Sequence, residues 1–152
     1  MAKLKSKRFK ILQKLAGRYE DLAAQDLGVS VGNLGAQQSR LIELQKFRDE
    51  YTQQLYQSGV SGINSTVMQS FQQFICQIDA AIQQQKKTVQ FAEQDHQLKK
   101  HKWEDKHKET RIYDKTIEKF TAREENDKEQ RDQVEIDDRN NARLKLNESD
   151  IT

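Results

Sequence analysis

The sequence predicts an all-α protein in which two long helices form an antiparallel coiled-coil hairpin. Of its 152 residues, 34% are hydrophobic and 33% are charged, which suits a thin seam between helices better than a thick globular core. Proline is absent, and Gln, Lys, Glu, Leu and Ala favour long uninterrupted helices. Apolar residues also recur at intervals of three and four along most of the chain, as in helices that pack along a partner.

The first helix is expected over about residues 5–57. Two sets of apolar residues predict its buried seam, in heptad frames that differ by one residue: Leu12, Leu15, Tyr19 and Leu22, then Leu41, Leu44, Tyr51 and Leu55. Three glycines lie in the stretch 28–35 between these sets, and each costs about 1 kcal/mol relative to alanine inside a helix. We therefore expect this stretch to be bent or locally open.

A loop is expected over about residues 58–65, where glycine and serine are concentrated. Thr66 and Gln69 then match a capping box with Thr66 as N-cap, which predicts a second helix over about residues 66–140. Residues 141–152 are expected to be a disordered tail, and the whole chain to be one hairpin domain. The predicted seam of the second helix passes through Phe71, Phe74, Ile78, Ala81, Gln85, Thr88, Ala92, Trp103, Thr110, Tyr113, Ile117 and Phe120.

Charge is distributed unevenly between the two ends of the chain. Residues 1–20 hold seven Lys or Arg and one Glu, whereas residues 121–152 hold ten Asp or Glu and six Lys or Arg. Because the hairpin pairs residues near Lys14 with residues near Glu109, the chain beyond about Phe120 is expected to overhang without a partner. The basic start, from Lys3 to Lys14, is a candidate for binding nucleic acid or an anionic membrane. The net charge of only +2 and the acidic second end argue against both, so no nucleic acid is expected as a partner.

Enzyme chemistry is not expected, because the sequence has no phosphate-binding loop and no nucleophile motif. Cys76 is interpreted as a packing residue. Glu93 and His96, like Glu104 and His107, have the Glu-x-x-His spacing of di-iron sites. Both pairs lie on one helix, among several lysines, whereas such a site needs two helices that converge on the metal. We expect no catalytic residue, no metal site and no cofactor.

Location is predicted from two absences. The sequence contains no run of 18 apolar residues, and a single cysteine cannot form an internal disulfide. Together these favour a cytoplasmic protein.

Aromatic residues gather on both sides of the predicted loop. Phe47, Tyr51 and Tyr56 precede it, and Phe71 and Phe74 follow it. A two-helix seam cannot bury all of them, so the sequence predicts either a thicker local core or an exposed docking patch.

The stretches 41–51 (LIELQKFRDEY) and 71–82 (FQQFICQIDAAI), with the Gly/Ser-rich loop between them, resemble the flagellar FliJ family. Outside residues 40–85 the resemblance lies in pattern and length. It implies a non-enzymatic stalk and chaperone component of the flagellar type III export apparatus, which serves flagellum assembly and motility. Such a protein links the hexameric export ATPase ring, which its helical ends enter, to the export gate.

The resemblance also implies partners and a binding strip. The strip is expected to dock on the cytoplasmic domain of the gate protein FlhA, and its expected residues are Leu44, Phe47, Tyr51, Phe74, Ile78 and Ala81, flanked by Arg40 and Gln85. Export chaperones are further partners that the resemblance allows. The protein is expected to be a monomer at the cytoplasmic face of the inner membrane, which it contacts through its partners only. The alternatives are a self-associating structural coiled coil and, behind it, a basic nucleic-acid-binding hairpin.

Overall fold

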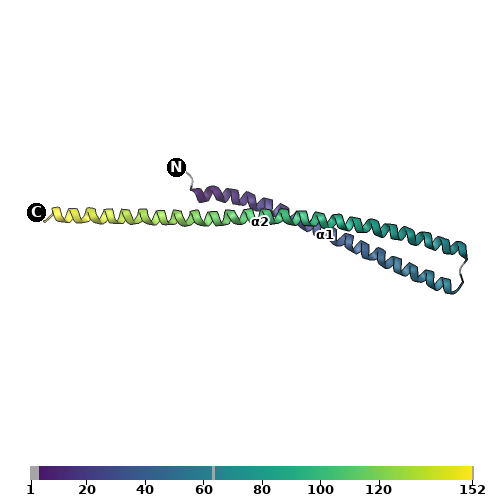
Figure 1. Cartoon of the computed structure of the whole chain (residues 1–152). Helices are drawn as coiled ribbons and strands as arrows, with labels where there is room; N and C mark the ends of the chain where they lie inside the picture. Colours follow the sequence, from purple (N-terminus) through teal and green to yellow (C-terminus); the bar gives the residue numbers. More distant parts are fainter. Residues whose placement is uncertain (1–3, 63, 152) are drawn as a thin grey trace. The chain divides into compact units, whose positions relative to one another are not determined.

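The computed structural model describes residues 4–62 and 64–151, which form two α-helices, α1 (Lys5–Val60) and α2 (Ser65–Ser149) (Figure 1). Lys3 of the basic start, Ile63 of the predicted loop and Thr152 of the predicted tail lie outside the described residues. The two helices pack against each other and the described residues contain no strand. The predicted all-α helical hairpin is therefore confirmed.

The chain divides into two compact units, where one hairpin domain was expected. The turn unit comprises residues 21–105, and the terminal unit comprises residues 1–20 and 106–152. A two-helix seam has no common centre, because each residue contacts only residues at its own level on the partner helix. Each unit therefore has its own short stretch of seam.

The reversal in the turn unit depends on two residues between the helices. Gly62 has a φ of 84°, in the left-handed region where a side chain is strained, and its N–H donates to the carbonyl of Gly59 at 3.3 Å. Asn64 then caps α2, since its Oδ1 accepts from the Thr66 N–H at 3.3 Å and its carbonyl accepts from the Met68 N–H at 3.1 Å. The prediction of Thr66 as N-cap is wrong by two residues, because the amide of Asn64 reaches the free N–H first.

The seam of the turn unit follows a regular spacing of three and four on both helices. On α1 the covered positions include Leu34 and the four residues that the sequence predicted as the second set, Leu41, Leu44, Tyr51 and Leu55. On α2 they include Phe71, Ile75, Ile78, Ile82, Gln85, Val89 and Ala92. The predicted positions Phe74 and Ala81 are instead exposed, because the seam passes through their neighbours Ile75 and Ile82.

α1 continues as an α-helix through residues 28–35, where the glycines predicted a bend or a local opening. Ser30 is only 3% exposed, and its Oγ donates to the carbonyl of Leu27 at 2.7 Å. Leu27, Ser30 and Leu34 keep the seam spacing, so packing sustains the helix where its intrinsic propensity is low. The expectation of an open segment is wrong.

In the terminal unit, residues 5–20 of α1 pack against residues 106–124 of α2. The covered positions on α1 are Ser6, Phe9, Gln13, Ala16 and Glu20, and those on α2 include Thr110, Tyr113, Ile117 and Phe120, as predicted. The predicted α1 positions Leu12, Leu15 and Tyr19 are 43%, 47% and 51% exposed. That part of the prediction is wrong, as it is for Leu22 in the turn unit, which is 56% exposed.

The last part of α2 lies outside the seam that the described residues of the terminal unit form. Every residue from 125 to 151 is exposed, and Figure 1 shows this end of α2 in yellow-green without a second helix beside it. α2 continues to Ser149, beyond the expected end near residue 140 and into the expected disordered tail. Residues 142–146 (ARLKL) are good helix formers and contain no glycine, which favours this extension.

Candidate functional site

The structure divides the expected binding strip into exposed and buried residues, all within the turn unit. Phe47 and Phe74 are 46% and 36% exposed, and Arg40 and Ala81 also lie on the surface. Leu44 and Tyr51 are half-buried in the seam. Ile78 and Gln85 are 5% and 9% exposed, so they lie between the two helices and offer little surface to a partner.

Four rings form one aromatic cluster near the turn: Phe47, Tyr51, Phe71 and Phe74. The ring of Tyr51 lies at the centre, 4.7 Å from the ring of Phe74, 5.2 Å from that of Phe71 and 6.3 Å from that of Phe47. Phe47 and Phe74 also meet edge to face at 6.2 Å. Such pairs contribute about 0.5–1.5 kcal/mol beyond area burial. The inner rings thicken the core, and they hold two outer rings at the surface.

An ion pair lies on the same elements as the aromatic cluster. Arg48 forms a bidentate pair with Asp79, in which Nη2 donates to Oδ2 at 3.3 Å and Nε donates to Oδ1. The hydrogen bond to Asp79 raises the pKa of Arg48 above its ordinary value. Both side chains remain partly exposed, so the pair contributes little to stability. Its main effect is to hold the guanidinium group and the carboxylate in fixed positions beside the aromatic cluster.

Gln85 has a structural role inside the seam of the turn unit. Its Nε2 donates to the backbone carbonyl of Gln37 at 3.0 Å and to the Oε1 of Gln37 at 2.9 Å. A buried polar pair of this kind favours one helix register, because any shift leaves the amides unpaired. Gln85 therefore supports the strip from beneath.

The seam of the terminal unit contains several polar pairs between the helices. Ser6 uses its Oγ and its N–H to donate to the carboxylate of Glu124, at 2.6 and 3.1 Å. The Nδ1 of His107 lies 2.7 Å from the Oε1 of Glu20. This hydrogen bond, more than the bond from Thr110, lowers the pKa of Glu20 below 4.5. Phe9 adds apolar contact, with its ring 5.1 Å from the ring of Phe120.

The candidate metal pairs do not converge in the described part of the chain. His107 contacts Glu20, and His101 lies 3.6 Å from Glu104. No group of three His, Cys, Asp or Glu side chains that could hold a metal ion occurs among the residues described.

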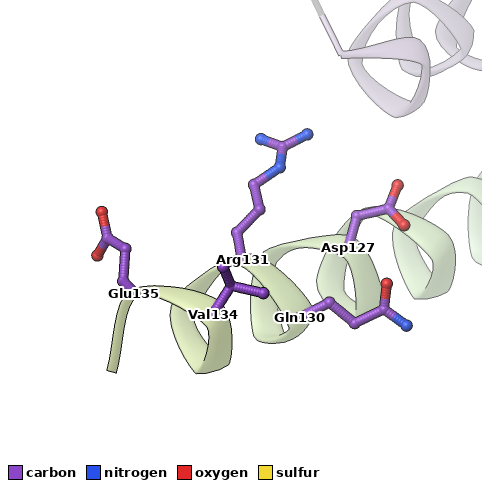
Figure 2. Close-up of a pocket in the computed structure, with 5 residues that line it drawn as sticks. All are labelled: Asp127, Gln130, Arg131, Val134 and Glu135. Carbon is purple, nitrogen blue, oxygen red and sulfur yellow. The ribbon is translucent and has the colours of Figure 1, made fainter. Parts of the chain in front are cut away.

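A surface depression in the terminal unit is lined by Asp127, Gln130, Arg131, Val134 and Glu135, all from the exposed end of α2 (Figure 2). Among residues 4–62 and 64–151, no helix is long and apolar enough to cross a bilayer.

Comparison with known proteins identifies the family. The model of the flagellar FliJ protein family matches residues 5–148, which is nearly the whole chain. This chain belongs to the FliJ family. No curated protein and no solved structure matches it. As a FliJ-family member it is a component of the flagellar export apparatus and interacts with other components of that apparatus.

Two features of this FliJ-family site were not predicted from the sequence. The Arg48–Asp79 pair was missed, although Arg48 stands in the heptad frame between Leu41 and Leu55, where a charge needs a partner. Phe71 was expected in the seam and among the aromatic residues beside the loop, but its ring contact with Tyr51, which completes the aromatic cluster, was not predicted.

Proposed function

We propose that this FliJ-family chain is a non-enzymatic stalk and chaperone component that links the hexameric export ATPase ring to the export gate. It acts at the cytoplasmic face of the inner membrane and docks there on the cytoplasmic domain of FlhA. The observation that carries the proposal is the aromatic cluster, which presents Phe47 and Phe74 at the surface of the turn unit.

The exposed rings are suited to act as hot spots of a protein interface. Exposed aromatic residues in fixed positions bury large areas at low entropic cost, and a few such residues dominate most interfaces. Tyr51 contacts the rings of both Phe47 and Phe74, so neither ring has to be ordered on binding. Arg40 and Ala81 extend the same strip, while Ile78 and Gln85 hold the helices beneath it.

The exposed end of α2, in the terminal unit, is the part proposed to enter the ATPase ring. Residues 125–148 of α2 are exposed along their whole length, so they lie outside the seam with α1 and their surface can contact a partner. An unbroken helix also suits a stalk, because coupling between two partners requires an element that resists bending.

The gate assignment is tested by measuring the affinity of the FlhA cytoplasmic domain for the full chain and for Phe74→Ala. We expect binding at least about tenfold weaker, equal to about 1.4 kcal/mol, because an outer ring of the cluster is lost. Tyr56→Ala is the matched control, since Tyr56 is 76% exposed and has no ring contact within the cluster. Unchanged binding by Phe74→Ala would contradict the proposal that the strip docks on the gate.

The ATPase assignment is tested separately, by ATP hydrolysis of the export ATPase with the full chain and with a chain that ends after residue 124. The full chain is expected to stimulate hydrolysis and the shortened chain to lose this effect, although its seam contacts are retained. Equal stimulation by both chains would contradict a role for the exposed end of α2.

A further inference from the structure

α1 has a second apolar face in the terminal unit, outside the seam with α2. Ile11, Leu12, Leu15 and Tyr19, here called the outer face, are 63%, 43%, 47% and 51% exposed. At 100° per residue, Ile11 and Leu15 lie on the side of the helix opposite the seam residues Phe9, Gln13 and Ala16. α2 reaches only the edge of this face, where the Nζ of Lys106 lies 5.7 Å from the ring of Tyr19, and it leaves Ile11 and Leu15 exposed.

The outer face is strongly basic. Residues 7–19 carry five Lys or Arg and no Asp or Glu, and all five cations are exposed. Arg8, Lys14 and Arg18 flank Ile11 and Leu15 on both sides. The nearby carboxylates of Asp114 and Glu124 bond to Gln13 and Ser6 in the seam, so they face away from the outer face.

We propose that the outer face binds an anionic lipid surface directly. An apolar stripe flanked by Lys and Arg, on a helix that is otherwise polar, is the pattern of helices that lie in the membrane interface. The apolar side chains enter the headgroup boundary, while the long cationic side chains extend to the lipid phosphates.

A partner helix fits the outer face less well than a lipid surface does. Arg8, Ile11, Leu15 and Arg18 follow one another at spacings of three, four and three, so a helix packed along them would bury both guanidinium groups in its seam. Burying such a charge is costly unless it is fully paired, whereas at a lipid surface both groups stay hydrated beside phosphates. The sequence predicted membrane contact through partners only, and direct lipid binding by the outer face is a different proposal.

The test is co-sedimentation of the full chain with vesicles of pure phosphatidylcholine or of phosphatidylcholine mixed with phosphatidylglycerol. We expect binding to the anionic vesicles only, and a loss of at least about tenfold in Ile11→Ser/Leu15→Ser. Val134→Ser/Ile136→Ser is the matched control, because these side chains are 59% and 50% exposed but lie on the acidic end of α2. Its binding should equal that of the wild type.

A second variant separates charge from apolar contact. Arg8→Gln/Lys14→Gln/Arg18→Gln should lose the preference for anionic vesicles while its helix content, measured by circular dichroism, is unchanged. Equal binding to both vesicle types, or unchanged binding by Ile11→Ser/Leu15→Ser, would overturn the proposal. A wild-type dimer that Ile11→Ser/Leu15→Ser abolishes would also overturn it, because a second copy would then cover the face. The proposal is independent of the stalk function, since neither the ATPase nor the gate is present in these assays.

Discussion

The seam of the turn unit is largely apolar, whereas the seam of the terminal unit mixes polar and apolar residues. In the turn unit the covered positions on α2 include Ile75, Ile78, Ile82 and Val89. In the terminal unit Ser6, Gln13 and Glu20 occupy the equivalent positions on α1. Apolar burial contributes about 25 cal/mol per Å², while exposed polar pairs contribute little. We therefore expect the seam of the turn unit to contribute more to the free energy of unfolding than the seam of the terminal unit does.

The largest expected difference is between two isoleucines. Ile78→Ala should lower the free energy of unfolding by about 2–4 kcal/mol, because Ile78 is 5% exposed in the seam of the turn unit. Ile11→Ala should change it by less than about 0.5 kcal/mol, because Ile11 is 63% exposed. Urea unfolding followed by circular dichroism measures both. Equal losses of unfolding free energy in Ile78→Ala and Ile11→Ala would contradict the difference drawn between the two units.

An intermediate effect is expected at Phe9, the one large apolar residue that residues 5–20 contribute to the seam of the terminal unit. Phe9→Ala should cost about 1–2 kcal/mol, less than a fully buried phenylalanine, because Phe9 is half-buried. Its ring contacts Tyr113 and Phe120, so the loss should appear as faster amide exchange in residues 106–124. Faster exchange in the turn unit instead would show that the two seams are not separate in stability.

The smallest effect concerns pH. The pKa of Glu20 is lowered in the folded state, so its contribution is present above about 4.5, its ordinary value, and is lost as pH falls through the folded pKa. The expected loss is less than about 1 kcal/mol, confined to the terminal unit. In Glu20→Gln this part of the acid sensitivity should disappear, as measured by amide exchange against pH. If Glu20→Gln loses as much stability at low pH as the wild type, other carboxylates cause the loss.

Apolar spacing predicted the hairpin and the seam of residues 41–55, and the glycines and serines of residues 58–65 predicted the turn. In residues 41–55 the apolar heptad positions are also the positions that pack against α2. In the terminal unit two frames compete. Leu12, Leu15 and Tyr19 form the more apolar one, yet the packed frame passes through Phe9, Gln13 and Ala16. Counting back from Leu41 in steps of seven reaches Leu34, Leu27, Glu20 and Gln13. A heptad frame continued along α1 would therefore have predicted the packed positions, whereas the choice of the most apolar residues did not.

The candidate site was predictable only in part. Aromatic residues on both sides of the turn indicated Phe47 and Phe74, but adjacent positions compete for the seam on α2. Phe74 and Ile75 differ by one residue, and only the packed register decides which of them is exposed. The pairing of Asp79 with Arg48 could not be predicted from the sequence, because which residues of the two helices face each other depends on the register across the turn.

Amide hydrogen exchange of the full chain, alone and bound to the FlhA cytoplasmic domain, tests the division of roles between the two units most directly. We predict added protection in residues 40–51 and 71–85 of the turn unit, with none in residues 5–20. Added protection in the terminal unit, with residues 40–51 and 71–85 unchanged, would contradict this division.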